Sequence, residues 1–242
     1  AVRVHDGYQG GVMQKMTKDY WAKNIETWKD APTPELAGVD MAIDLDPSHG
    51  RLGVRGWYDV VNHTDQPMRR FPVTVNPDWK DLRWTLGGES LKTENRAGLH
   101  IVTLKSPLAP GDRARLGFTY SGHQPQGISK NGGAEMEFIL PESIVLTALG
   151  SPTLAPQLGY SKDVGVEADK NKADPREWPE DWFEGRNPAG IPMAGSWFDC
   201  HLTVTVPASL EVNATGEKVA DAVANGRRVT EWRTDHPVRI FN

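Results

Sequence analysis

The end of this chain alternates apolar and polar residues with a period of two. In residues 196–207, Asp, His or Thr separates the apolar positions, which are Phe198, Cys200, Leu202, Val204 and Val206. Successive side chains of an extended strand point to opposite faces, so this period predicts strands with one face in a core. The pattern returns in residues 210–216, 226–232 and 237–241, which are predicted to be strands as well.

The same alternation begins at Val39 and fills most of the chain. Strands are predicted at residues 39–45, 52–60, 71–75, 82–86, 99–104, 114–120, 136–140 and 144–148. Turn sequences separate them, including residues 46–50, and Asn225-Gly226 favours a type I′ hairpin turn. Short strands at such regular spacing indicate a mainly β protein, an antiparallel sandwich or saddle-like β domain.

One amphipathic helix is predicted before the first strand, over residues 12–29. Its apolar positions recur at steps of three and four residues, at Met13, Met16, Tyr20, Trp21, Ile25 and Trp28. Pro32 and Pro34 end the pattern. We expect this helix to dock on the sheet, and the alternative is a helix that binds a membrane surface or a partner. The chain thus divides into residues 1–35, a helix and linker, and residues 36–242, the β domain.

Composition excludes several classes of function. The 27 Lys and Arg are scattered among 32 Asp and Glu, for a net charge of −5, so no basic stripe exists to follow a nucleic acid. No apolar run approaches the roughly 20 residues of a membrane span, and we expect the chain itself to be soluble. The single cysteine, Cys200, excludes an intramolecular disulfide and is expected to be a small buried apolar residue.

No self-contained catalytic site is predicted. Among the seven His, none lies three or four residues from another, which argues against a zinc-binding helix. No Gly-x-Ser-x-Gly motif is present. Carboxylate pairs are judged by distances in space, so the sequence leaves a hydrolase with paired acids open as a third hypothesis. We therefore expect no catalytic residue, metal ligand or cofactor in this chain.

A long irregular loop is predicted over residues 163–195, which are rich in proline and charge. Connections of this length inside a compact domain are usually functional or mobile. Trp178 and Trp182 are its candidates for exposed aromatic side chains that stack on a sugar or bind an extended peptide. This loop supports an alternative function, a stand-alone β-sandwich module that binds carbohydrate or protein.

Three segments carry a resemblance to a known family. Residues 39–64 hold an alternating hairpin that ends in Asn62-His63-Thr64, residues 108–122 hold a Pro-Gly loop and a strand that ends in Tyr-Ser-Gly, and residues 156–160 read Pro-Gln-Leu-Gly-Tyr. In this order, and with the closing strands, they resemble the N-terminal all-β domain of the aminopeptidase N family of zinc metallopeptidases. The Pro-x-x-Gly-Tyr segment is similar to a divergent branch that is fused to ABC-transporter permeases.

The resemblance implies a non-catalytic β domain that packs against a downstream peptidase domain of the same chain and shapes its substrate cleft. The family's Gly-x-Met-Glu-Asn and His-Glu-x-x-His motifs are not in this sequence, so the resemblance places zinc and peptide hydrolysis in a domain beyond Asn242. It also implies an extracytoplasmic location at a bacterial membrane. Gln157 and Tyr160 are the candidates to face the catalytic domain. The family's acidic and Ala-Arg positions before Pro156 are missing here.

Overall fold

The computed structural model describes residues 11–28, 30–123, 138–146, 154–161 and 197–242. The helix is α2 (Gly11–Trp28), and a 3₁₀ turn, η1 (Pro47–His49), follows the first strand. The strands are β1 (Glu35–Asp46), β2 (Arg51–Val61), β3 (Met68–Thr74), β4 (Lys80–Leu86), β5 (Glu89–Leu91), β6 (Glu94–Arg96), β7 (Leu99–Leu108), β8 (Arg113–His123), β9 (Phe138–Leu140), β10 (Ser143–Val145), β11 (Gln157–Leu158), β12 (Asp199–Pro207), β13 (Glu217–Ala224) and β14 (Arg227–Arg233).

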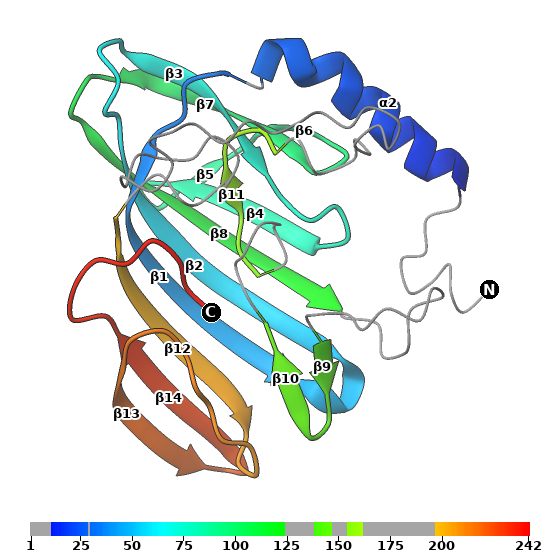
Figure 1. The fold of residues 1–242 in the computed structure, drawn as a ribbon, viewed down its shortest axis with the longest axis vertical. Coiled ribbons are helices and arrows are strands. Elements are labelled where there is room, and N and C mark those ends of the chain that lie inside the picture. The colour runs from blue at the N-terminus through cyan, green and yellow to red at the C-terminus, as the bar shows by residue number, and fades with distance from the viewer. Residues whose placement is uncertain (1–10, 29, 124–137, 147–153, 162–196) are drawn as a thin grey trace, which may run out of the picture.

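An eight-stranded sheet forms the body of the fold. Its strand order is β13-β14-β12-β1-β2-β8-β4-β5. β1 and β12 pair in parallel, and all the other neighbouring strands of this sheet pair antiparallel. Figure 1 shows this sheet curving from the red β13–β14 hairpin to the cyan β4. A second sheet has the order β11-β3-β7-β6, and β9 and β10 form a separate hairpin. The prediction of a mainly β, largely antiparallel fold with one N-terminal helix is confirmed.

The period of two explains which face of the large sheet is buried. In β1, Met41, Ile43 and Leu45 are buried, whereas Asp40 and Asp44 point to the other face. Their neighbours in β12, Leu202 and Val204, are buried on the same side. Apolar residues of β3 and β7 belong to the same hydrophobic cluster, so the second sheet covers this apolar face.

Two predicted turns have the backbone that their residues favour. After η1, Gly50 adopts a left-handed conformation with φ of 63°, and the chain returns along β2. Asn225 and Gly226, between β13 and β14, have φ of 52° and 75°. Positive φ at both central residues is the requirement of a type I′ turn, so this hairpin is confirmed.

Two strand predictions near the C-terminus are wrong. Residues 210–216 form no strand, although Leu210, Val212 and Ala214 pack against the core from an irregular segment. Residues 237–241 form only one bridge, between Phe198 and Val238. Besides the short strands β5, β6 and β11, the sequence missed β13. The residues of β13 are all exposed, so no apolar face produces a recognisable alternation.

The helix docks on the second sheet through Trp21, as predicted. Trp21 is buried with Leu99 and Ile101 of β7, and its indole N–H donates to the carbonyl of Ala97 at 2.8 Å. Lys15 and Met16 are exposed on the helix. Figure 1 shows α2 beside β6 and β7.

We expect Trp21→Ala to lower the free energy of unfolding by about 3 kcal/mol, because it removes a large buried ring and leaves a cavity. Urea denaturation followed by circular dichroism measures the change. Met16→Ala, at an exposed position of the same helix, is the control and should change stability by less than about 0.5 kcal/mol. A loss below about 1 kcal/mol for Trp21→Ala would show that α2 is not anchored through this residue.

His100 is a buried titratable group in β7. Its Nδ1 accepts a hydrogen bond from the indole N–H of Trp84 at 3.1 Å, and Thr93 Oγ1 lies 2.8 Å from the same atom. Burial lowers the pKa of this imidazole from 6.5 to about 4. His100 is therefore neutral in the folded chain at a pH where the unfolded chain binds a proton.

Because the pKa of His100 is lower in the folded chain than in the unfolded chain, we predict a loss of stability in mild acid. Above pH 6.5 His100 is neutral in both states, and between 6.5 and about 4 only the unfolded state is protonated, so stability falls as the pH falls. From pH 7 to pH 5 this residue should contribute a loss of about 2 kcal/mol. Urea denaturation at both pH values measures it, with His100→Gln as the reference. Equal losses in the two proteins would contradict the assignment.

Candidate functional site

Two of the four predicted site residues, Gln157 and Tyr160, lie in a segment, residues 154–161, that runs between the two sheets. Tyr58 of β2 donates its hydroxyl to the carbonyl of Pro156 at 2.8 Å, and Tyr120 of β8 donates to the carbonyl of Leu154. Burial raises the pKa of both tyrosines well above its ordinary value, so both are neutral donors. On the other side, β11 pairs with β3, and Thr74 Oγ1 donates to the carbonyl of Gly159 at 2.7 Å. The segment is thus fixed to both sheets.

The side chain of Gln157 is buried in this segment. The residue is 1% exposed, and among the described residues neither its side-chain amide nitrogen nor its amide oxygen has a hydrogen-bond partner. The buried hydroxyl of Ser161 also has none. A buried polar atom that lacks a partner costs about 1–3 kcal/mol, so native structures rarely keep one without a reason. Gln157 is therefore the polar side chain of this segment most in need of a further partner.

Tyr160 has a different environment from Gln157. Its ring lies 4.7 Å from that of Trp21, centroid to centroid, and its hydroxyl donates to the carbonyl of Trp21 at 2.6 Å. Burial raises the pKa of this phenol from 10.0 to about 12. Tyr160 thus connects the segment to helix α2, while Gln157 lies against the interior.

The other two candidate residues, Trp178 and Trp182, lie outside the described residues. So does the whole of the predicted loop, residues 163–195. The binding-loop hypothesis stays a prediction.

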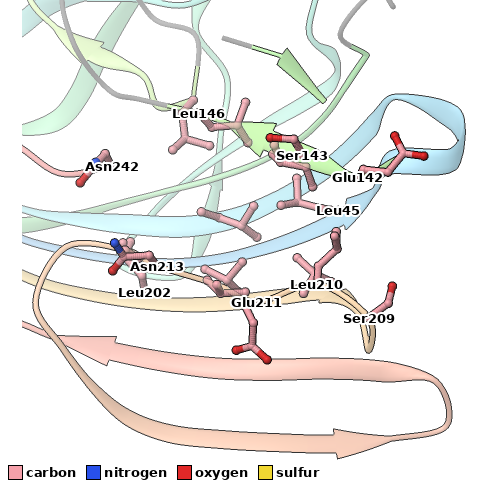
Figure 2. Close-up of a pocket in the computed structure, with 17 residues that line it drawn as sticks. Leu45, Glu142, Ser143, Leu146, Leu202, Ser209, Leu210, Glu211, Asn213 and Asn242 are labelled. Carbon is pink, nitrogen blue, oxygen red and sulfur yellow. The ribbon is translucent and has the colours of Figure 1, made fainter. Parts of the chain in front are cut away.

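A pocket that the sequence did not predict opens on the apolar face of the large sheet (Figure 2). Its volume is about 430 Å³. β1 and β12 form its floor, hairpin β9–β10 forms one side, and residues 209–214 form another. The apolar residues of the pocket wall, Leu210, Val212 and Ala214, alternate in the sequence, and this alternation predicts a strand there, not a pocket wall.

The polar face of the large sheet holds a histidine between two carboxylates, which the sequence also did not single out. His201 Nδ1 lies 2.7 Å from Asp40 Oδ2, and His201 Nε2 lies 4.0 Å from Glu231 Oε2. The three residues come from neighbouring strands, β12, β1 and β14, which explains why sequence spacing did not bring them together. Within the part of the chain that the structure describes, no three His, Cys, Asp or Glu side chains are placed to hold a metal ion.

Cys200 is buried, as predicted. Burial, with a smaller effect from Asp40, raises the pKa of its thiol from 9.0 to about 12. Because the thiolate is the nucleophile, this cysteine is inert at neutral pH.

The fold is shared with solved zinc metallopeptidases of the M1 type. An M1 zinc metallopeptidase from Deinococcus radiodurans superimposes with a TM-score of 0.54 and 17% identity, over 86% of this chain and 40% of that one. A mutant M1 zinc metallopeptidase from the same organism, bound to a Tyr-Ser-Ala substrate, gives 0.53 and 16%, over 85% and 40%. A two-domain M1 mutant bound to L-tryptophan gives 0.52 and 17%, over 86% and 41%.

The likeness defines the fold, which matches the N-terminal domain of M1 metallopeptidases. The chain spans about 40% of the length of the solved structures it matches. By sequence, the chain matches no protein-family profile and no curated protein. In the described residues, no helix combines the length and apolar character that a membrane crossing requires.

Replacing Gln157 by leucine should stabilise the isolated chain. Leucine has a similar size and leaves no unpaired polar atom, so we expect the free energy of unfolding to rise by about 1 kcal/mol in urea denaturation. Gln66→Leu, at an exposed glutamine, is the matched control and should show no gain. A loss of more than about 1 kcal/mol for Gln157→Leu would mean that its amide is satisfied in solution.

Proposed function

We propose that this chain is the non-catalytic N-terminal β domain of a zinc aminopeptidase-like protein. It packs against a catalytic domain that follows in the same polypeptide and forms one wall of the substrate cleft. The observation that carries the proposal is the likeness in fold, which spans 86% of this chain but 40% of the M1 structure. The remaining length of such enzymes leaves room for the domain that hydrolyses the peptide.

The metal belongs outside this chain under the proposal. Zinc requires three or more side chains that converge on one point, and the described residues do not supply such a set. The described residues are therefore assigned no step in bond cleavage. Their role is to bind the neighbouring domain and to limit which peptides reach it.

Gln157 is the residue that we assign to the cleft wall. Within the described part of the chain its amide nitrogen and oxygen are unpaired, and a carboxamide can hydrogen-bond the amine or the carbonyl of a peptide. Because the amide is covered in the isolated chain, this role requires the cover to open when the catalytic domain is in place. Tyr160 supports the wall, since its hydroxyl and ring hold the segment against α2.

An exposed aromatic group supports a docking surface for the catalytic domain. Trp197 is 61% exposed, and the guanidinium of Arg239 lies 4.6 Å from its ring centroid. Ile240, which follows Arg239 in the sequence, is also exposed. Tryptophan and arginine dominate the energetics of protein interfaces, because they bury a large area and also hydrogen-bond.

The sequence resemblance supports two finer statements. The complete protein acts on peptides at the extracytoplasmic side of a bacterial membrane, and it belongs to the branch fused to transporter permeases. The motif behind the second statement is the Pro-Gln-Leu-Gly-Tyr segment at residues 156–160.

The proposal predicts a division of activity between domains. Residues 1–242 alone should release no fluorophore from aminoacyl substrates with added zinc, whereas the product extended by the residues that its gene encodes after Asn242 should. The assay compares zinc-loaded and chelated samples of both proteins. A zinc-dependent rate from residues 1–242 alone, or no His-Glu-x-x-His in the extension, would overturn the proposal.

Association of the two parts tests the docking surface. In a titration of residues 1–242 with the separately produced extension, Trp197→Ala should weaken binding by about tenfold or more, because it removes a hot-spot ring. Val223→Ala, at an exposed valine of β13, is the control and should bind normally. Equal binding by both variants would place the interface elsewhere.

A further inference from the structure

The pocket on the apolar face of the large sheet has the build of a small-molecule site. Buried side chains of β1 and β12 form its floor, including Leu45 and Leu202, and Leu146 and Leu210 close two of its sides. Figure 2 shows these four leucines around a common space. Its volume of about 430 Å³ falls within the usual range of ligand pockets, roughly 300–1,000 Å³.

The floor of the pocket is apolar, whereas its rim is polar and open to solvent, with exposed Glu142, Glu211 and Asn213. Water over the leucine and valine floor finds few polar partners. A ligand with an apolar body would displace that water and gain the free energy of hydrophobic burial.

The rim of the pocket selects the charge of the ligand. Two carboxylates line it, those of Glu142 and Glu211, and none of the lining residues is basic. Glu211 is paired with Arg228 at 2.8 Å, and Asp221 binds both the same guanidinium and the ammonium of Lys218 at 2.8 Å. The two negative and two positive charges on this side balance, and Glu142 on the hairpin adds one further negative charge at the rim. A negatively charged head group would be repelled.

One end of the pocket offers hydrogen bonds. Asn213 and Asn242 lie there in Figure 2. Among the described residues the amide of Asn213 has no hydrogen-bond partner, whereas Asn242 Oδ1 accepts from Thr215 at 2.7 Å. A carboxamide is able to bind either an alcohol or an amine.

From these observations we propose that the pocket binds a small apolar ligand whose polar head is uncharged or cationic, such as a medium-chain aliphatic alcohol or amine. The site is separate from Gln157 and does not depend on the peptidase proposal. It assigns to the β domain a ligand of its own.

Two fluorescent probes with the same ring system test the proposal. N-phenyl-1-naphthylamine is uncharged, and 8-anilinonaphthalene-1-sulfonate adds a sulfonate. We expect the uncharged probe to saturate at one per chain of 242 residues and to bind about tenfold more tightly than the sulfonate. 1-Aminooctane should displace it, and octanoate should be about tenfold weaker as a competitor.

Variants locate the binding site. Ala214→Phe places a ring in the pocket and should weaken the uncharged probe by about tenfold or more, because it occupies the space the probe needs. Ala222→Phe, at an exposed alanine of β13, is the matched control and should bind normally. Glu142→Gln should raise the affinity for the sulfonate probe about threefold, since it removes one negative charge.

Three results would overturn the proposal: probe binding that does not saturate, equal binding of the two probes, or full probe binding by a folded Ala214→Phe chain. If Ala214→Phe does not fold by circular dichroism, the competition between 1-aminooctane and octanoate in the unaltered chain decides the charge preference. The effect of Glu142→Gln then decides the location.

Discussion

The need to cover one face of the eight-stranded sheet determines how the rest of the structure is arranged. That face is apolar along β1, β2, β8 and β12, and the second sheet, the segment at residues 154–161 and hairpin β9–β10 all lie against it. Tyr58 and Tyr120 of the large sheet hold residues 154–161 in place by hydrogen bonds to the carbonyls of that segment. Where the cover is incomplete, between β12 and the hairpin, the pocket remains.

Sequence reasoning found the parts of the fold that this burial controls. Strands such as β1 and β12 alternate because one face is buried, and the turn at Asn225-Gly226 needs positive φ, so both left a signal. β13 left no apolar alternation of its own, because it is exposed on both faces. Leu210, Val212 and Ala214 led to a wrong strand prediction, since apolar and polar residues also alternate in this irregular segment that packs on the core.

The candidate site shows what spacing alone does not reveal. The Pro-Gln-Leu-Gly-Tyr motif identified Gln157 and Tyr160, but their different surroundings, one unpaired in the interior and one bonded to α2, depend on contacts with residues far away in sequence. The Asp40, His201 and Glu231 group and the pocket likewise join distant strands. Pairing between distant strands is a tertiary property, so one sequence does not contain it in readable form.

The central proposal is that this β domain forms one wall of a peptidase's substrate cleft, where the side-chain amide of Gln157 binds the peptide. The most direct measurement is an experimental structure of the complete gene product with a bound peptide. The account predicts a zinc-bearing domain packed on Trp197, and Gln157 within hydrogen-bonding distance of the peptide. A peptidase domain that contacts neither residue, or a product with no such domain, would contradict it.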